Sequence, residues 1–228
     1  MKEDILEQVV DDYLQARGFF TRHNVKFRPR KGHPHFVSRD DSVPSDIDVL
    51  GVDPHARGSS KVWVVSCKSW QAGFNVRSKL AELTENKTRA GRESWRFFRE
   101  LMVPKWSEAF RDAVFRETGS RNFTYVTAVT RLSGDPSEWE QLPRFQRAMR
   151  GNPVRLLALS DMVAYILQRL TRTPASSDLG RTLQLLKAAG VLEEDGDLAR
   201  AQPNKALQPT SRGQQRAKSR RSPRAARG

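Results

Sequence analysis

The chain has 228 residues, among them 40 Lys or Arg against 26 Asp or Glu, so its formal net charge is +14. This length suits one substantial core with a small appendage, and no segment approaches the roughly 20 consecutive apolar residues that a membrane-spanning helix needs. The one cysteine, Cys67, excludes an internal disulfide and a zinc site of paired cysteines, and the acidic start MKEDILEQVV is unlike a secretory signal, so we expect a reducing, intracellular compartment.

The first part of the chain predicts one helix followed by three strands. EDILEQVVDDYLQARG has the apolar spacing of an amphipathic helix that ends near Gly18. FFTRHNVKFR predicts a strand, and a basic loop follows it as far as Pro44. DIDVLGV and KVWVVSCK predict two further strands, which the turn-rich DPHARGSS joins into a hairpin. The apolar stripe of the helix consists of Ile5, Leu6, Val9, Val10, Tyr13 and Leu14.

The remaining part predicts alternating helices and strands. After Trp70 the pattern is helical for about fifty residues, with Gly91 and Pro104 as interruptions. Strands are predicted at 122–130 and 154–159, with a helix around RFQRAMR between them. Ser160 and Asp161 are expected to cap the helix DMVAYILQRL, and LGRTLQLLKAAG predicts a last helix. This order predicts an α/β protein with a mixed sheet flanked by helices.

The end of the chain carries much of the positive charge. From Ala201 onward there are eight basic residues and no acidic one, so the rest has a surplus of only six positive charges. Without aromatic residues or apolar periodicity, residues 199–228 are expected to form a disordered basic tail. Two interpretations stay open. The tail is an arm that binds nucleic acid, or, because NKALQPTSRG resembles the ends of many unrelated bacterial reading frames, it is translated repetitive DNA whose charge says little about function.

Side chains alternate between the two faces of a strand, which predicts how the hairpin presents its polar residues. Asp46 and Asp48 are expected to share a face opposite Ile47 and Val49. On the next strand, Val64, Ser66 and Lys68 point one way and Trp63, Val65 and Cys67 point the other.

Pairing of the two strands would bring Asp48, Ser66 and Lys68 together at one edge. Lysine is disfavoured where water is excluded, and a neighbouring carboxylate would balance its charge. Carboxylates hold Mg²⁺ through hard oxygen ligands, and a cation beside an ammonium group stabilises the charge that develops during phosphodiester hydrolysis. The sequence therefore predicts a metal-assisted hydrolytic site.

At these residues the sequence resembles the PD-(D/E)XK, or restriction endonuclease-like, nuclease superfamily, and more loosely its Mrr-type branch. The family pattern has an acidic residue on a helix, an Asp at the end of one strand, and a (Glu/Gln/Asp)-x-Lys on the next. The matching positions are Glu7, Asp48 and Ser66-Cys67-Lys68. The resemblance implies a restriction endonuclease-like nuclease domain over residues 1–173, followed by a helical extension at 174–198 and the tail.

The resemblance also implies an endonuclease, a hydrolase that uses Mg²⁺ or Mn²⁺ to cut phosphodiester bonds in DNA, in restriction, defence or repair. Asp48 is the expected principal metal ligand, with Asp46 and the backbone carbonyl of Cys67 beside it. Lys68 is expected to orient the attacking water or the scissile phosphate, and Glu7 to assist through a second metal or a hydrogen bond.

Ser66 departs from the family pattern, because Glu, Gln or Asp usually stands at its position. A neutral hydroxyl deprives the metal of a strong anionic ligand. Three outcomes are open: Asp46 substitutes for the missing group, Ser66 acts through a bound water, or the site no longer cuts. In the last case the chain is a catalytically degenerate nuclease-fold protein that serves as a nucleic-acid-binding or interaction module.

Basic residues precede the strand that carries Asp48. From Arg22 to Arg39 there are six of them and no acidic residue, and such a segment would bind a phosphate backbone in a salt-dependent way. The expected contacts with nucleic acid are Arg28, Arg30, Lys31, Arg39 and Trp70. The expected partner is DNA and not a membrane, in the bacterial cytoplasm near the nucleoid, and a homodimer is left open.

Plainer interpretations exist for each of these residues. The aspartates can blunt a sheet edge, Lys68 can reach past the strand end to solvent, Glu7 can be an ordinary solvated helix residue, and Trp70 can close the core. A basic RNA-associated protein with structural aspartates is a third functional interpretation.

Overall fold

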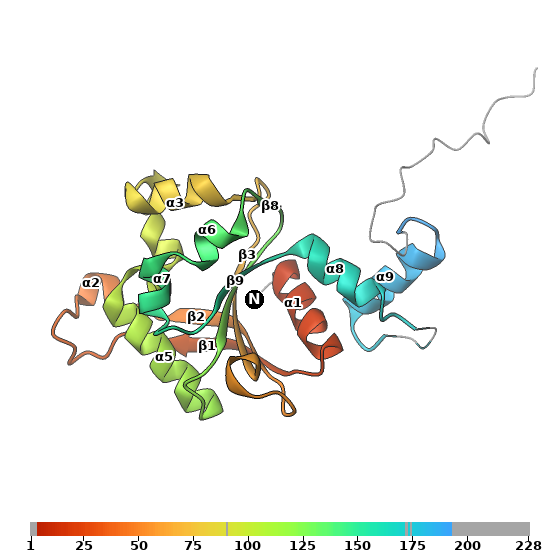
Figure 1. Ribbon diagram of the computed structural model, residues 1–228, viewed down its shortest axis with the longest axis horizontal. Coiled ribbons are helices and arrows are strands. Elements are labelled where there is room, and N and C mark those ends of the chain that lie inside the picture. Colours follow the sequence, from red (N-terminus) through yellow and green to blue (C-terminus); the bar gives the residue numbers. More distant parts are fainter. Residues whose placement is uncertain (1–3, 90, 172, 174, 193–228) are drawn as a thin grey trace, which may run out of the picture.

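A five-stranded mixed sheet forms the centre of the computed structural model, which describes residues 4–89, 91–171, 173 and 175–192 (Figure 1). Its strand order is β1-β2-β3-β7-β9; β1–β2 and β2–β3 are antiparallel, whereas β3–β7 and β7–β9 are parallel. The strands are β1 (Phe20–Phe27), β2 (Ser45–Val52), β3 (Val62–Lys68), β7 (Thr124–Val129) and β9 (Val154–Ala158). The predicted α/β class and the predicted hairpin of β2 and β3 are confirmed.

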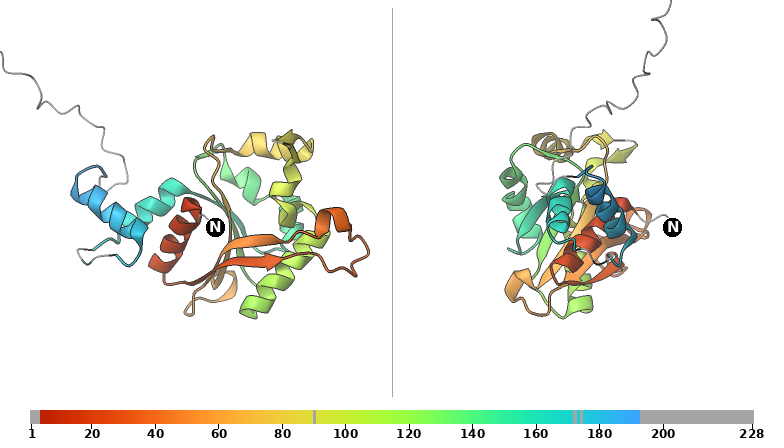
Figure 2. Two further views of the ribbon diagram at one scale, coloured as in Figure 1. Left: turned by 180° about the vertical axis from the view of Figure 1, so that it is seen from behind. Right: turned by 90° about the vertical axis from the view of Figure 1, so that its right-hand side faces the viewer.

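Helices lie on both faces of this sheet (Figures 1 and 2). One face is covered by α1 (Ile5–Ala16), α8 (Leu159–Leu167) and α9 (Asp178–Ala188). The opposite face is covered by α3 (Val76–Thr84), α4 (Arg99–Met102), α5 (Pro104–Thr118), α6 (Pro136–Glu140) and α7 (Pro143–Ala148). The loop between β1 and β2 contains a single helical turn, α2 (Ser38–Asp41), and 3-10 turns occur at Gly58–Ser60 and Ser94–Phe97.

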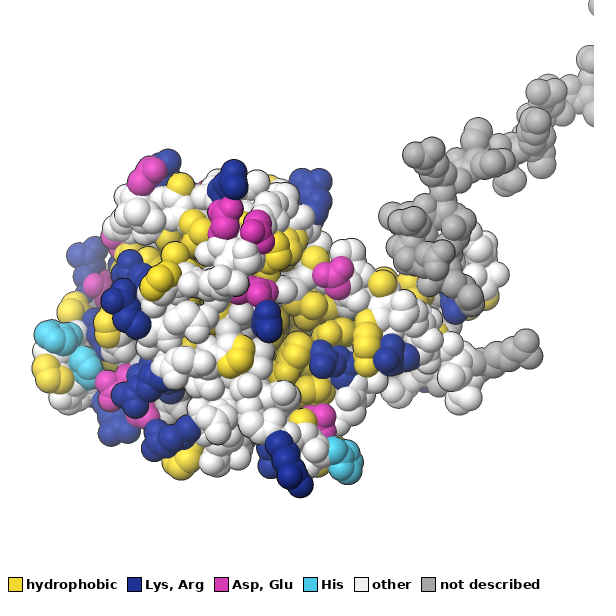
Figure 3. All heavy atoms as spheres, in the orientation of Figure 1, with side chains coloured by type: hydrophobic (Ala, Val, Ile, Leu, Met, Phe, Trp, Pro, Cys, Tyr) yellow, Lys and Arg dark blue, Asp and Glu magenta, His cyan; other side chains and the backbone are white. Residues whose placement is uncertain are grey.

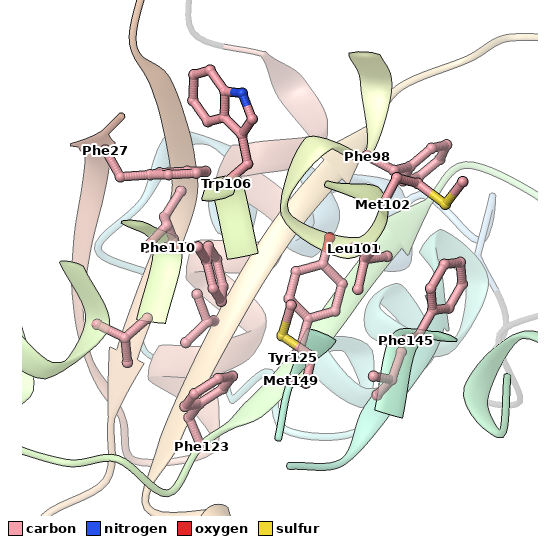
Figure 4. Packing of buried hydrophobic residues seen from close by; sticks show 14 of the residues in the cluster. Phe27, Phe98, Leu101, Met102, Trp106, Phe110, Phe123, Tyr125, Phe145 and Met149 are labelled. Carbon is pink, nitrogen blue, oxygen red and sulfur yellow. The ribbon is translucent and has the colours of Figure 1, made fainter. Parts of the chain in front are cut away.

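The sheet separates two hydrophobic cores. The core on the α1 side contains Tyr13, Leu14 and Val65, and the larger core on the α5 side is rich in aromatic rings (Figure 4). All six residues of β7 are buried, as expected for a central strand with parallel neighbours and helices on both faces. The rings labelled in Figure 4 within the α5-side core are Phe27, Phe98, Trp106, Phe110, Phe123, Tyr125 and Phe145.

The long helical segment predicted after Trp70 is wrong in its middle. Three very short strands interrupt it. β4 (Phe74–Asn75) pairs with β8 (Leu132–Ser133), which lies beyond the segment, and β5 (Thr88–Arg89) pairs with β6 (Arg92–Glu93). Gly91 has a φ of 74° in the turn between β5 and β6, a conformation that favours glycine over other residues. Pro104 is the first residue of α5, the position of a helix that best tolerates proline.

Smaller predictions also need correction. Ile5 is 70% exposed because it lies beside the stripe formed by the five buried residues of α1. Helix α8 begins at Leu159, directly after β9, so Ala158 occupies the cap position and the predicted capping by Ser160 and Asp161 is wrong. The predicted tail, 199–228, lies outside the described residues. Among the residues described, no helix has the length and apolar character needed to cross a membrane.

Candidate functional site

The hairpin ladder between β2 and β3 stops where the polar residues begin. Its residue pairs run from Val52–Val62 to Val49–Val65. Beyond the last pair, Oδ2 of Asp48 accepts a hydrogen bond of 2.5 Å from the backbone N–H of Cys67. The aspartate side chain thus continues the connection between the two strands, and it holds its carboxylate at the end of β3.

Lys68 lies at the same end of β3. Its Nζ donates a hydrogen bond of 2.9 Å to Oγ of Ser66 and lies 5.5 Å from the centre of the Phe98 ring. Its backbone is held by the parallel pairing of β3 with β7, which extends to Lys68 and Val129. The positive charge of Lys68 lowers the pKa of Asp48, against the effect of burial. The structure thus brings Asp48, Ser66 and Lys68 to one edge of the sheet.

Helix α1 delivers Glu7 to this edge from the opposite core. Asp4 caps the helix by accepting a 2.9 Å hydrogen bond from the N–H of Leu6, and it also accepts one from the hydroxyl of Ser69. The start of α1 is therefore tied to the residue that follows Lys68. Burial, followed by the charges of Asp48, Asp4 and Asp46, raises the pKa of Glu7 from 4.5 to about 7, against the influence of His23.

The carboxyl of Asp48 is also harder to ionise than usual. Its pKa rises from 3.8 to about 6, mainly because burial disfavours the charged form. Lys68 and the hydrogen bond from Cys67 lower the pKa, whereas the carboxylates of Asp46 and Glu100 raise it. Several negative charges thus act on one half-buried position, and the charge of Lys68 opposes them.

Asp46 is engaged elsewhere. Its Oδ2 forms an ion pair of 2.5 Å with Nζ of Lys26, its partner in the register of β1 and β2. The charge of Asp46 still acts on Asp48, but its carboxylate already has a cationic partner. To substitute for an acidic group at position 66, the half-exposed carboxylate of Asp46 would have to leave Lys26.

The predicted face of β2 is wrong. Ile47 packs in the α5-side core and Val49 in the α1-side core, so these two residues do not share a face. The pairing of β1 with β2 passes over Asn24 and Asp48, and Asn24 has a φ of 54°. This left-handed residue breaks the regular alternation of side chains opposite Asp48. The alternation predicted for β3 is observed, with Cys67 on the α1 side and Val64 on the α5 side.

Glu100 is a member of this site that sequence reasoning missed. It is 5% exposed on α4, and its Oε1 accepts a hydrogen bond of 2.5 Å from the hydroxyl of Tyr125, which is fully buried on β7. Figure 4 shows this phenol directed toward α4. The signal in the sequence is a single acidic residue inside the otherwise apolar or basic run FFRELMV.

The donor set fits a hard cation that keeps most of its own water. Within the described part of the chain, no three or more His, Cys, Asp or Glu side chains are close enough together to hold a metal ion. Mg²⁺, however, commonly uses only one or two protein carboxylates and completes its shell with water and substrate phosphate. Asp48, with its raised pKa and with Lys68 beside it, supplies the kind of oxygen that such an ion requires.

The predicted nucleic-acid contacts lie in two different places. Arg28, Arg30, Lys31 and Arg39 are exposed in and beside the loop between β1 and β2, which extends away from α8 and α9 (Figures 1 and 2). Arg30 forms an ion pair with Asp112 of α5. Lys and Arg side chains gather around this end of the molecule (Figure 3).

Trp70 lies just after the end of β3 and packs against the aromatic core on the α5 side. It is half-buried, stacks on Phe74 and meets Phe97 and Phe98 edge to face. Nζ of Lys79 lies 4.7 Å from the centre of its ring. The ring therefore has a structural role whether or not nucleic acid also touches it.

Comparisons with protein-family models, with curated proteins and with solved structures found no match to this chain.

Proposed function

We propose that this protein is a divalent-metal-dependent endonuclease of the restriction endonuclease-like type that cuts DNA. The observation that carries the proposal is the meeting of Asp48 and Lys68 at one sheet edge, the first bonded to the N–H of Cys67 and the second to Ser66. A carboxylate and an ammonium group on neighbouring strands are what metal-assisted phosphodiester hydrolysis needs.

Asp48 would hold Mg²⁺ or Mn²⁺, together with the backbone carbonyl of Cys67. A bound divalent ion neutralises charge on the scissile phosphate and makes a coordinated water more acidic. Lys68 donates hydrogen bonds to a phosphate oxygen or to the attacking water, while Ser66 fixes the direction of its ammonium group. Glu7, whose pKa is about 7, can accept and release a proton near neutral pH.

DNA is favoured as the substrate because exposed basic residues surround the loop that leads into β2. A loop anchored next to the strand of Asp48 can bind the phosphate backbone on one side of the cleavage position. The ion pair between Arg30 and Asp112 fastens this loop to α5.

The proposal is tested by incubating the full-length protein with supercoiled, linear and single-stranded DNA in Mg²⁺ or Mn²⁺. We expect cleavage by the wild type and none by Asp48→Ala, with EDTA abolishing the activity. If the wild type leaves all three substrates intact in both metals, the proposal of an enzyme is wrong.

Ser66 supports a second candidate, a nuclease-fold protein that binds nucleic acid without cutting it. The hydroxyl of Ser66 bonds to Lys68 and brings no negative charge to the site. Such a protein would bind DNA equally well after Asp48→Ala and in the absence of divalent metal, whereas an active site would lose cleavage under both conditions.

A further inference from the structure

Glu100 is a buried carboxylate without a cationic partner. None of the described Lys, Arg or His side chains forms an ion pair with it, whereas the buried carboxylate of Asp41 pairs with Lys105. A buried charge is costly unless it is paired or binds a metal. The hydroxyl of Tyr125 holds Oε1, and Oε2 makes no hydrogen bond with any described residue.

The surroundings of Tyr125 place Glu100 close to Ser66. The phenol of Tyr125 donates a hydrogen bond to the carboxylate of Glu100. Burial and then Glu100 raise the pKa of Tyr125 well above the ordinary value, whereas the hydroxyls of Thr127 and Ser66 lower it. Ser66 and Thr127 are direct partners in the register of β3 and β7. A carboxylate carried by α4 thus reaches the neighbourhood of the strand position where the family pattern has an acidic side chain.

Helix α4 also lies beside Lys68. The ring of Phe98, the residue directly before α4, lies 5.5 Å from Nζ of Lys68, and Glu100 is in the first turn of this helix. In agreement with this placement, the charge of Glu100 contributes to the raised pKa of Asp48 on β2. The two carboxylates therefore approach the same edge from different elements.

We propose that Glu100 is the second carboxylate ligand of the divalent cation and replaces the acidic group that position 66 lacks. This inference rests on the proposed metal-dependent function. The hydrogen bond from Tyr125 orients one oxygen of Glu100 and leaves Oε2 for the cation, so Tyr125 is a positioning residue.

A purely structural role for Glu100 makes a different prediction. Its hydrogen bond with Tyr125 needs an acceptor and not a charge, so glutamine would serve equally well. The two roles are therefore separated by Glu100→Gln, which keeps the shape and the acceptor but removes the charge.

The experiment is a calorimetric titration of the full-length protein with Mn²⁺ alone at pH 7.5, on the wild type, Asp48→Ala, Glu100→Gln, Tyr125→Phe and the control Glu140→Gln. Glu140 is a largely buried glutamate on α6 that pairs with Arg155 away from the site. Thermal unfolding without metal is measured on the same samples to check that each variant is folded.

Loss of a residue that only orients a metal ligand typically weakens metal binding about 10–100-fold, and we expect this range for Tyr125→Phe. Glu100→Gln removes a proposed ligand itself, so it should weaken Mn²⁺ binding at least as much. Glu140→Gln should bind as the wild type does. In the double variant Ser66→Glu with Glu100→Gln, a carboxylate returned to the strand should restore most of the affinity.

The outcomes separate the two proposals. If the wild type binds Mn²⁺ more tightly than Asp48→Ala but Glu100→Gln binds like the wild type, the role of Glu100 is overturned and the metal site stands. If the wild type and Asp48→Ala bind Mn²⁺ equally weakly, the metal-dependent function itself fails. Restored binding in the double variant excludes unfolding as the cause of the loss in Glu100→Gln.

Discussion

The N–H of Cys67 donates to Oδ2 of Asp48 at 2.5 Å, just beyond the last paired residues of β2 and β3. Asp48 therefore serves as a structural link and as a candidate metal ligand at once. Its carboxylate is fixed in direction by a strand that also presents Lys68, so the relative position of the two groups is set by the sheet. The predictions below test the consequences of this arrangement.

Lys68 is expected to be essential for cleavage but not for folding. Lys68→Ala should reduce the cleavage rate by about 100–1,000-fold, because a preorganised donor to the developing charge is lost. Its side chain is half-buried and, among the residues that the structure describes, hydrogen-bonds to Ser66 alone, so the unfolding temperature should change little. The measurement is the rate of plasmid nicking, with Lys61→Ala, an exposed lysine at the opposite end of the hairpin, as the control. Equal losses in both variants would contradict a specific role.

The raised pKa of Asp48 makes metal-free stability depend on pH. Because its pKa is about 6 in the folded protein and 3.8 ordinarily, the folded state binds this proton more tightly, so stability falls as pH rises from about 4 to about 7. Asp48→Asn keeps an oxygen acceptor for Cys67 and removes the charge. In EDTA it should be more stable than the wild type by roughly 1–2 kcal/mol at pH 8, after discounting for the partial exposure of the site.

Urea unfolding of the wild type and Asp48→Asn at pH 4 and pH 8 measures this difference. The gap should become much smaller at pH 4, where Asp48 is protonated in the folded wild type and about two-fifths protonated in the unfolded chain. The pKa of Glu7 is also raised, so the stability of both proteins depends on pH for this second reason. The effect of Asp48 is therefore given by the difference between their free energies of unfolding. A gap of the same size at both pH values would show that the charge of Asp48 is not its source.

Ser66→Glu distinguishes an intact site from a degenerate one. Because Glu100 already supplies a carboxylate in our proposal, the single variant should change the cleavage rate by less than about threefold, or roughly 0.6 kcal/mol in activation free energy. Single-turnover cleavage at saturating Mg²⁺ is the measurement. A gain of several orders of magnitude would identify the natural protein as a nuclease fold that has lost its activity.

The basic loop is expected to bind phosphates independently of sequence. Lys31 and Arg39 are exposed and neither forms an ion pair with a described residue, so replacing both with Gln should lower the slope of log Kobs against log[salt] by about 2. Fluorescence anisotropy of labelled duplex DNA over a range of NaCl concentrations measures the slope. The matched control changes Arg57 and Lys61, which are exposed in the turn at the other end of β2 and β3. An unchanged slope in the loop variant would place the DNA elsewhere.

Asp41 is expected to hold the basic loop against α5. Its fully buried carboxylate accepts hydrogen bonds from the N–H of Val37 at 2.7 Å, from Nε1 of Trp106 at 3.0 Å and from Nζ of Lys105 at 2.6 Å. Asp41→Ala should lower the free energy of unfolding by about 2–4 kcal/mol, because it leaves these donors without their partner. Chemical denaturation measures the change. The neighbouring Asp40, which is half-buried and pairs with Arg96, should lose less stability when it is replaced in the same way. Comparable losses would mean that Asp41 has no special role.

The sequence predicted the elements that depend on local pattern. Alternation in KVWVVSCK placed Ser66 and Lys68 on one face, and the apolar spacing of residues 6–14 placed a helix beside the sheet; both are observed. The predicted alternation of side chains between the two faces was wrong for β2 at Asp48. Asn24, on the neighbouring strand β1, has a left-handed backbone conformation that interrupts the regular pairing at this position. The sequence pattern also did not predict the short strands between Trp70 and Pro104. Each is only two residues long: β4 pairs with β8, and β5 pairs with β6 across a tight turn.

By itself, the sequence determined the class of fold, the hairpin that carries Asp48 and Lys68, and the identity of its polar residues, because hydrophobic periodicity and turn residues act over a few positions. Only the tertiary structure decided which carboxylates meet there. Asp46 pairs with Lys26, whereas Glu100, 32 residues after Lys68, is brought near by the packing of α4 over β7. Electrostatic interactions act through space, so a charge distant in the chain can contribute to a site that local spacing alone would assign to its neighbours.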